Sequence, residues 1–382
     1  MPSWLMSVAD LDRMVEVLQR DAGEVVAPVL VDGVIRLRQI EGADDLPVGV
    51  TDAQGGGAYR VERGSGSSER RFSYAVGPDS VKAIVHPPRS PVWTMRRADD
   101  GAVAVTVHSH VSRKCAVIGV RSCDLAALAR LDRTQLDGPH PDPAHAAARA
   151  GLFIVAVDCS YPAATCFCES VGTGPTVDGD DHGADLVLTE MADDGAVWYL
   201  VRACTDPGRA VVDELGLDTA TPQAIDRADA ERRTVHADRR AMRPDAATVV
   251  LADLTHPRWD DVAERCLTCG NCTAVCPTCF CTDTDDRVDL DGIAHRDRVW
   301  DTCFSAEYSH LGPGPERSTP MARYRQWLTH KIGTWHHQFG ESGCVGCGRC
   351  ITWCPVGIDL TAEVDALAEP VAAPEGPGHH DH

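Results

Sequence analysis

The segment from Cys266 to Pro277 constrains this chain more than any other part of it. Its sequence is Cys-Leu-Thr-Cys-Gly-Asn-Cys-Thr-Ala-Val-Cys-Pro. Two residues separate successive cysteines among the first three, and three residues separate the third from Cys276, which a proline follows. This is the thiolate spacing of cubane iron–sulfur sites. The same pattern recurs from Cys344 to Pro355.

In such a run, a tight turn brings three sulfurs to one cluster. The fourth cysteine starts the next helix and points toward the other cluster. The spacing therefore predicts two [4Fe-4S] clusters, one held by Cys266, Cys269, Cys272 and Cys354, the other by Cys344, Cys347, Cys350 and Cys276. Paired Cys-x-x-Cys sequences also suit tetrahedral zinc. Two complete copies, each ending in Cys-Pro, favour a two-cluster ferredoxin module instead.

The composition limits the kinds of binding partner and the cellular compartment that we expect for this chain. A net charge of -21 and a pI near 5.1 argue against nucleic acid or anionic lipid as ligands. An acidic surface suits docking to basic patches on a protein partner, and plain solubility explains it equally well. The 17 cysteines stand mostly at metal-ligand spacings, and the N-terminus does not read as a signal peptide. We therefore expect a reducing, cytoplasmic setting.

Hydrophobic patterning predicts no direct membrane insertion. No apolar run approaches the roughly 18 residues of a membrane-spanning helix. Any link to a membrane is therefore expected to go through another subunit.

Residues 1–245 are predicted to form an α/β domain with a partly parallel sheet. Apolar strands at 115–120 and 152–157 flank a helix that opens at Asp124, which is a parallel βαβ pattern. A hairpin is expected around Asp32-Gly33. The remaining expected elements are a helix at 4–20, strands at 185–188 and 197–201, a helix at 207–215 and a helix-prone connection at 216–247.

Glycine-rich stretches do not provide a nucleotide site. Residues 55–68 are rich in glycine and serine and are predicted to be a mobile loop without a phosphate-binding role. Neither this loop nor Gly172-Thr-Gly174 fits the Gly-x-Gly-x-x-Gly fingerprint of a dinucleotide-binding turn. The chain is therefore not expected to oxidise a nicotinamide by itself.

Residues 246–368 are predicted to form an α-helical two-cluster ferredoxin domain. A long insertion, 282–340, separates the two cysteine runs, and 369–382 is predicted to be a disordered tail. The insertion contains a basic amphipathic helix near 319–335. Its cations form either a partner-docking face or a solvated one; they are Arg317, Arg323, Arg325 and Lys331.

Nine further cysteines lie outside the two runs, and four of them are predicted to converge. Cys123 and Cys159 each follow a parallel strand, and Cys166 and Cys168 lie in the next loop. The carboxyl ends of parallel strands share one sheet edge, and the helix that opens at Asp124 favours thiolate there. We predict a third iron–sulfur cluster at these four cysteines. The alternative is that they are small buried hydrophobic residues.

Neighbouring residues suit a supporting role at this third group. Arg121 is predicted to offset the negative charge of a cluster, and Asp124 to cap the helix. The amides of Gly172 and Gly174 either donate to cluster sulfurs or belong to an ordinary turn.

A second Cys-Phe-Cys sequence occurs at 279–281, and Cys303 follows in the insertion. Alternating cysteines point to opposite sides of an extended backbone, so they do not bind one cubane by themselves. They are expected to line a domain contact or to tune a nearby cluster, with a dithiol or catalytic role as the alternative. Cys115 and Cys204 are interpreted as structural.

Several of these motifs together carry a family resemblance. They are Gly119-Val-Arg-Ser-Cys-Asp-Leu125, Cys166-Phe-Cys-Glu-Ser-Val-Gly-Thr-Gly-Pro175, Cys269-Gly-Asn-Cys-Thr-Ala-Val-Cys-Pro-Thr-Cys-Phe-Cys281, Trp300-Asp-Thr-Cys303 and His330-Lys331. From about residue 70 to 360, the chain resembles the iron–sulfur (beta) subunit of cytoplasmic sulfhydrogenases. It is also similar to the A subunit of anaerobic sulfite reductase. One departure is Ser122, where the pattern has proline.

The resemblance implies a subunit that carries electrons without catalysing the reaction itself. Its donors or acceptors would be a flavin- and NAD(P)-binding subunit and the small and large subunits of a [NiFe]-hydrogenase. In the sulfite reductase the acceptor would be a siroheme subunit. A third hypothesis is a self-contained thiol or sulfur reductase that uses the N-terminal cysteines.

Overall fold

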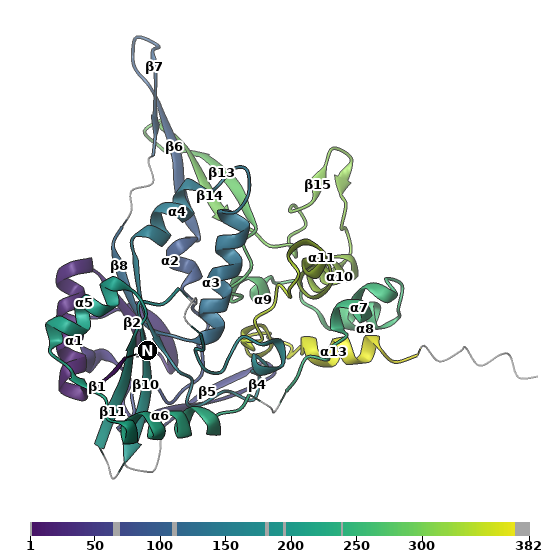
Figure 1. Ribbon diagram of the computed structural model, residues 1–382. Helices are drawn as coiled ribbons and strands as arrows, with labels where there is room; N and C mark the ends of the chain where they lie inside the picture. Colours follow the sequence, from purple (N-terminus) through teal and green to yellow (C-terminus); the bar gives the residue numbers. More distant parts are fainter. Residues whose placement is uncertain are drawn as a thin grey trace, which may run out of the picture.

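The computed structural model describes residues 2–63, 69–108, 113–179, 183–193, 196–237 and 240–370. Within these ranges the largest sheet is mixed, with the order β12-β1-β11-β10-β9-β8-β2-β3; its strands β1, β2, β8, β10 and β11 are labelled in Figure 1. Strands β2, β8, β9 and β10 are parallel neighbours, and the other pairs are antiparallel. The strands are β1 Ser3–Ser7, β2 Val25–Val31, β3 Val34–Gln39, β8 Cys115–Val120, β9 Leu152–Val157, β10 Leu186–Asp193, β11 Ala196–Ala203 and β12 Asp218–Thr219.

The predicted hairpin and parallel strands are confirmed. The turn between β2 and β3 has φ values of 50° at Asp32 and 76° at Gly33. Positive φ at both central residues is the geometry that joins two twisted strands with a two-residue turn. The apolar strands β8 and β9 pair in parallel, with Cys115 opposite Leu152.

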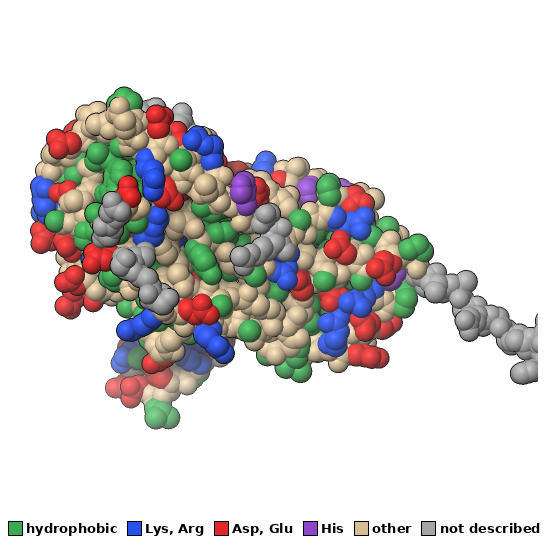
Figure 2. All heavy atoms as spheres, turned by 90° about the horizontal axis from the view of Figure 1, so that it is seen from below, with side chains coloured by type: hydrophobic (Ala, Val, Ile, Leu, Met, Phe, Trp, Pro, Cys, Tyr) green, Lys and Arg blue, Asp and Glu red, His purple; other side chains and the backbone are tan. Residues whose placement is uncertain are grey.

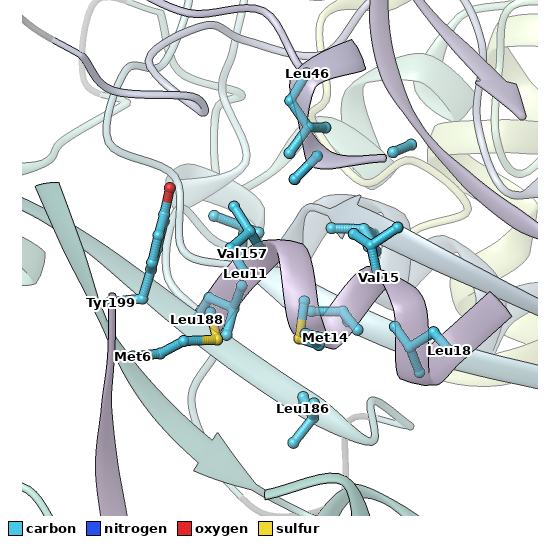
Figure 3. Packing of buried hydrophobic residues seen from close by; sticks show 14 of the residues in the cluster. Met6, Leu11, Met14, Val15, Leu18, Leu46, Val157, Leu186, Leu188 and Tyr199 are labelled. Carbon is cyan, nitrogen blue, oxygen red and sulfur yellow. The ribbon is translucent and has the colours of Figure 1, made fainter. Parts of the chain in front are cut away.

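Two helices cover one face of this sheet. Helix α1 (Val8–Ala22) begins after Ser7, whose hydroxyl accepts from the Asp10 amide in a capping box. The predicted helix started earlier, but Trp4 belongs to β1. The apolar side of α1 packs with α5 (Asp206–Leu215) against alternate strand residues. Figure 3 shows the contacting side chains, among them Met6, Leu11, Met14, Leu188 and Tyr199.

The opposite face carries the helix that begins beside Cys123. Leu125, Leu128 and Leu131 of α3 (Ser122–Gln135) pack on Val117 and Ile154. Three more helices lie on this side of the domain: α2 Lys82–Val85, α4 Pro143–Ala150 and α6 Pro222–Thr234. The carboxyl ends of β8 and β9 therefore lie between α3 and the C-terminal part of the chain.

A second sheet joins segments that are far apart in sequence. Its order is β13-β14-β6-β7 in the described residues, and its β6–β7 end projects from the body of the molecule (Figure 1). Strands β6 (Arg89–Arg97) and β7 (Val103–Val107) come from the N-terminal part, while β13 (Thr282–Val288) and β14 (Ala294–Trp300) come from the insertion. The C-terminal part is therefore not wholly helical as predicted, because its insertion supplies these strands.

The glycine-rich segment after residue 55 is largely a hairpin rather than the predicted loop. Strands β4 (Val50–Gly55) and β5 (Ala58–Arg63) pair antiparallel; residues 64–68 lie outside the described ranges. The Gly57 amide donates to the Ile351 carbonyl over 3.1 Å, and Tyr59 stacks on Trp353 at 5.1 Å between ring centroids. The hairpin tip thus packs on the second cysteine run, which holds it in place.

The rest of the C-terminal part is built from short helices around one core. Trp259, Phe304, Tyr324, Trp327, Leu328 and Leu360 contribute to that core. The elements are α7 Ala246–Ala252, α8 Arg258–Arg265, α9 Asn271–Ala274, β15 His310–Leu311, β16 Gly314–Pro315, α10 Pro320–Leu328, α11 Trp335–Phe339, α12 Arg349–Thr352 and α13 Leu360–Leu367, with a π-helical turn at Thr329–Thr334. Two short 3-10 turns, Ala43–Asp45 and Glu169–Val171, lie in the N-terminal part.

Among the described residues, no helix has both the length and the apolar character needed to cross a bilayer. On the face shown in Figure 2, acidic and basic side chains are interspersed, so the net negative charge does not form one continuous acidic patch there. The predicted disordered tail falls almost entirely on residues 371–382, which lie outside the described ranges.

Candidate iron–sulfur centres

Five cysteines of the C-terminal part surround one cavity. Cys266, Cys269 and Cys272 of the first run lie on its wall together with Cys354, the last cysteine of the second run. Cys350 is the fifth. The other side chains that line the cavity are uncharged: Leu267, Phe304, Tyr324, Trp327, Pro355, Val356, Ile358 and Leu360. The fold thus brings together the four cysteines predicted for the first cluster.

The second predicted set also converges. Burial, and then the charges of the nearby Cys344, Cys347 and Cys276 thiols, raise the pKa of Cys350 well above its ordinary value. The Cys276 thiol adds likewise to the raised pKa of Cys344 and of Cys347. Cys276 therefore lies with the distant run, which is the placement that the crossed assignment predicts. Because Cys350 also borders the first cavity, the two sets of cysteines are adjacent.

Backbone amides point at the sulfurs of both runs. Three N–H groups donate to cysteine Sγ atoms over 3.3–3.4 Å. The pairs are Thr268 to Cys266, Gly346 to Cys344, and Ile358 to Cys354. Such bonds stabilise the thiolate form and are one of the ways in which a protein sets the potential of a cluster.

The first cavity also has unused hydrogen-bond donors on its wall. The Tyr324 hydroxyl and the Trp327 Nε1 group are buried and have no hydrogen-bond partner among the described residues. Buried donors of this kind are normally satisfied. Four thiols with two spare donors around an uncharged cavity fit a [4Fe-4S] cluster, whose sulfur atoms accept hydrogen bonds.

The surroundings shift the pKa of these thiols in different directions: a hydrogen bond with Cys279, together with the charge of Lys331, holds the pKa of Cys276 well below its ordinary value. Burial raises the pKa of Cys266, of Cys272 and, to about 12, of Cys344. Iron ligands must be thiolates, so coordination itself would drive the loss of their protons. No group of three His, Cys, Asp or Glu side chains in the described ranges is arranged to hold a single metal ion.

The third predicted group lies directly against the second. Cys123, Cys166 and Cys168 are buried and pack together with Cys347 in one cluster of buried residues. Burial, and then the thiols of Cys159 and Cys168, raise the pKa of Cys166 well above its ordinary value. All four predicted cysteines therefore lie in one region, and Cys347 is their contact with the second run.

Close backbone packing joins this third group to the second run. The Phe167 amide donates to the Gly346 carbonyl over 2.8 Å. Gly346 has a φ of 61°, and a Cβ atom there would stand 2.6 Å from the backbone nitrogen of Cys168. Only glycine allows this approach. The loop of Cys166 and Cys168 is consequently pressed onto the second cysteine run.

The residues predicted to support the third group have mixed placements. Asp124 does not cap α3, whose N-cap position is Arg121 without a side-chain cap bond. Asp124 instead forms a buried ion pair with Arg349, which satisfies its carboxylate more strongly than a cap bond. Arg121 donates to the carbonyls of Asp158, Phe72 and Tyr74, so its guanidinium is used mainly by the backbone.

The two glycines predicted near the third group also differ from each other. A Cβ atom on Gly174 would lie 3.3 Å from the Cys168 sulfur, so its backbone does approach that cysteine closely. A Cβ atom on Gly172 would have no neighbouring atom within 4 Å, and this glycine ends a 3-10 turn in the left-handed conformation. Its placement matches the ordinary-turn alternative.

Of the four cations expected on a docking or solvated face of the insertion, Lys331 is buried, whereas Arg317, Arg323 and Arg325 are half-buried. Lys331 is only 7% exposed. Arg323 donates to the carbonyls of Arg317, Phe304 and Ser318, and Arg325 donates to the Leu254 carbonyl. The two arginine side chains thus hydrogen-bond to neighbouring backbone segments, because a guanidinium group provides several donors in a fixed arrangement.

The second Cys-Phe-Cys sequence lies between the first two cysteine sets and the N-terminal domain. Phe280 packs against the core on the α3 face of the large sheet. Burial, and then the Cys281 thiol, raise the pKa of Cys303 to about 12, and the charge of Cys303 acts in turn on Cys272. This is a placement at a domain contact, as expected, and beside the first cavity.

Comparison with known proteins adds two findings to this geometry. Residues 265–358 match the family model for a 4Fe-4S dicluster domain. Over 264 residues, the chain is 33% identical to the sulfhydrogenase 2 subunit beta of Pyrococcus furiosus, with 67% of this chain and 75% of that protein covered.

The cysteine geometry and the matching domain define an iron–sulfur protein whose role is electron transfer. Its clusters are of the kind that the two Cys-Pro runs predict. More particularly, the chain belongs to the family of sulfhydrogenase beta subunits.

Proposed function

We propose that this chain relays electrons within a hetero-oligomeric cytoplasmic [NiFe]-hydrogenase. It would connect a flavin- and NAD(P)-binding subunit with the hydrogenase small and large subunits. The observation that carries the proposal is a row of three adjacent cysteine sets. Cys350 borders the first and second sets, and Cys347 borders the second and third. Such a row suits stepwise electron transfer, whereas a lone site would suit chemistry on a bound substrate.

In this proposal each set of four cysteines holds one cluster. Cys266, Cys269, Cys272 and Cys354 bind the first, and Cys344, Cys347, Cys350 and Cys276 bind the second. Cys123, Cys159, Cys166 and Cys168 bind a third. The ferredoxin unit would span 246–368 and the α/β unit 1–245, with the third site at the contact between them.

The chain's own residues would position and insulate the clusters. A bound cluster supplies one-electron chemistry. Phe304, Tyr324 and Trp327 keep water from the first cavity, and the amides of Thr268, Gly346 and Ile358 hold the sulfurs in place. The exposed end of the relay is the first set, since Cys269 is exposed to solvent.

A self-contained thiol reductase is less well supported by this geometry. Cys123, Cys166 and Cys168 are each 7% exposed or less, so a substrate would have little access to them. A sulfite reductase complex remains the nearer alternative, because the same relay would serve a siroheme subunit.

Two measurements test the proposal. Anaerobically purified chain should contain about twelve irons, four for each of three cubanes. About eight irons, with Cys123 and Cys159 freely alkylated, would remove the third cluster but leave the relay. The co-purifying subunits decide the complex: nickel indicates hydrogenase, siroheme indicates sulfite reductase, and turnover by the isolated chain with an artificial donor contradicts the relay.

A further inference from the structure

Lysine is rare in this chain, and its distribution is uneven. The sequence contains only Lys82, Lys114 and Lys331, although it is rich in arginine. Lys114 is exposed. The other two are 4% and 7% exposed, and both lie beside Cys276. Burying an ammonium group is unfavourable unless its charge is compensated, so these two positions call for a functional explanation.

Lys331 reaches the second cysteine set from the π-helical turn. Its Nζ donates to the Thr278 hydroxyl over 2.8 Å, and that hydroxyl lies 3.3 Å from the Cys276 sulfur. The side chain is 7% exposed, so its ammonium group is buried one hydroxyl group away from the Cys276 sulfur.

Lys82 approaches the same cysteine from the N-terminal domain. Its Nζ donates to the carbonyls of Thr273 and Ala274 and stands 3.8 Å from the ring centroid of Trp300. Lys82 is thus held by backbone carbonyls and an indole ring, whereas Lys331 is linked to the Cys276 sulfur through the Thr278 hydroxyl, so Lys331 is the one to test.

Two buried arginines complete this positive shell. Arg349 lies between Cys347 and Cys350 in the sequence and is 2% exposed. Arg130 is 6% exposed and donates to the carbonyl of Ser342, two residues before Cys344, over 2.7 Å. Asp124 and Glu341 each offset one of these guanidinium groups. Lys331 has no carboxylate within ion-pair distance in the described ranges.

The first cavity is electrostatically different. None of the residues on its wall is charged. Both cysteine sets have hydrogen-bond donors nearby, so the donors do not account for a difference in reduction potential between the two clusters. A cubane held by four thiolates is an anion whose negative charge grows on reduction, and nearby positive charge favours the reduced form. The difference in charge therefore predicts a difference in reduction potential.

We propose that the buried Lys331 ammonium group gives the second cluster a higher reduction potential than the first. This inference rests on the proposed function, since it assumes that both clusters are bound. Lys331 is not a catalytic residue here; it acts through its charge on the reduction potential of the second cluster. Electrons that enter at the exposed first cluster would then collect on the second, next to the third cysteine group.

The test is a redox titration of the full-length chain, followed by electron paramagnetic resonance. K331M should shift the higher-potential reduction step downward and leave the lower one in place. The expected change is at least tenfold in the ratio of reduced to oxidised cluster at a fixed potential, which is about 59 mV for one electron. K114M removes the same charge at an exposed position and should leave both steps unchanged.

Further variants keep the outcomes distinct. K331R retains the charge and should stay near wild type. If K331M fails to retain iron, K331Q replaces it, because an amide still donates to Thr278. V356K adds a cation at the wall of the first cavity, where Val356 is 40% exposed, and should raise the lower step. Full iron with unshifted steps in K331M or K331Q overturns the inference, whereas wild-type chain without two cubanes overturns the proposed function.

Discussion

Arg349 and Asp124 form a two-pronged ion pair in the interior of the molecule. The guanidinium Nη1 and Nη2 atoms donate to the two carboxylate oxygens over 2.7 and 2.9 Å. Arg349 also donates to the carbonyls of Gly77 and Asp79. Asp124 follows Cys123 directly, so this pair fixes the second cysteine run against the start of α3.

Removing one partner of this pair should destabilise the protein strongly. In D124A the buried guanidinium loses its countercharge, and the free energy of unfolding should fall by about 3–5 kcal/mol. The double variant D124A/R349M removes both charges and should lose less than D124A. Anaerobic urea unfolding, followed by tryptophan fluorescence, measures these differences.

The matched control for D124A is an exposed ion pair. Arg296 and Asp286 are 41% and 54% exposed, so D286A should cost at most about 1 kcal/mol. If D124A proved no more destabilising than D286A, the buried pair would not be what holds the two units together.

The crossed ligand assignment makes a prediction for Cys276. In C276S, the spectrum to change should be that of the cluster of the Cys344 run, although Cys276 belongs to the first run in sequence. The reason is that the Cys276 sulfur lies with Cys344 and Cys347 in the fold. C115S replaces a buried thiol of β8 and serves as the control with unchanged spectra. A change confined to the other cluster in C276S would reverse the assignment.

The sequence predicted which cysteines the fold brings together, because the patterns that place them are local. The Cys-x-x-Cys-x-x-Cys turns and the parallel strands β8 and β9 are short-range patterns. Their periodicity and spacing determine where the sulfurs go. The convergence of Cys123, Cys166 and Cys168 followed from a general rule about the edges of parallel sheets.

The sequence did not predict features that depend on long-range contacts. Asp124 matched the pattern of a helix cap, but its carboxylate pairs with Arg349, more than two hundred positions away. Lys331 matched a surface position on an amphipathic helix, yet the π-helical turn at Thr329–Thr334 places its ammonium group in the interior. The only signal in the sequence for a special role of Lys331 was that lysine is scarce in this chain.

Replacing Gly346 should separate the third cysteine group from the second. In G346A the added Cβ would lie 2.6–2.7 Å from backbone atoms of Phe167 and Cys168, so one of the two backbone segments would have to move. We expect a loss of stability above the roughly 1–2 kcal/mol of a strained left-handed alanine. Faster alkylation of Cys166 and Cys168 should accompany it, measured by mass spectrometry.

The control for G346A separates strain from collision. Gly340 has a φ of 77° with no atom within 4 Å of its Cβ position, so G340A carries the strain alone. Equal effects of G346A and G340A, with Cys166 and Cys168 still protected, would mean that the close approach at Gly346 does not hold the loop.

His86 should make the stability of the protein sensitive to mild acid. The ring is 2% exposed, neither of its nitrogens has a hydrogen-bond partner in the described ranges, and it stacks on Trp300 at 6.3 Å between centroids. Burial, aided by the charges of Arg298 and Lys82, lowers the pKa of His86 to about 4. The unfolded chain has the ordinary value near 6.5.

The direction of this effect follows from proton binding. Between pH 6.5 and 4 the unfolded chain binds more protons at His86 than the folded one, so the free energy of unfolding falls as the pH falls. From pH 7.5 to 5.5 the contribution should be about 1 kcal/mol. H86L should lose that much less stability over this interval than wild type, by urea unfolding at both pH values. H310L alters an exposed histidine and should behave as wild type, and the same acid sensitivity in H86L would assign the effect to another group.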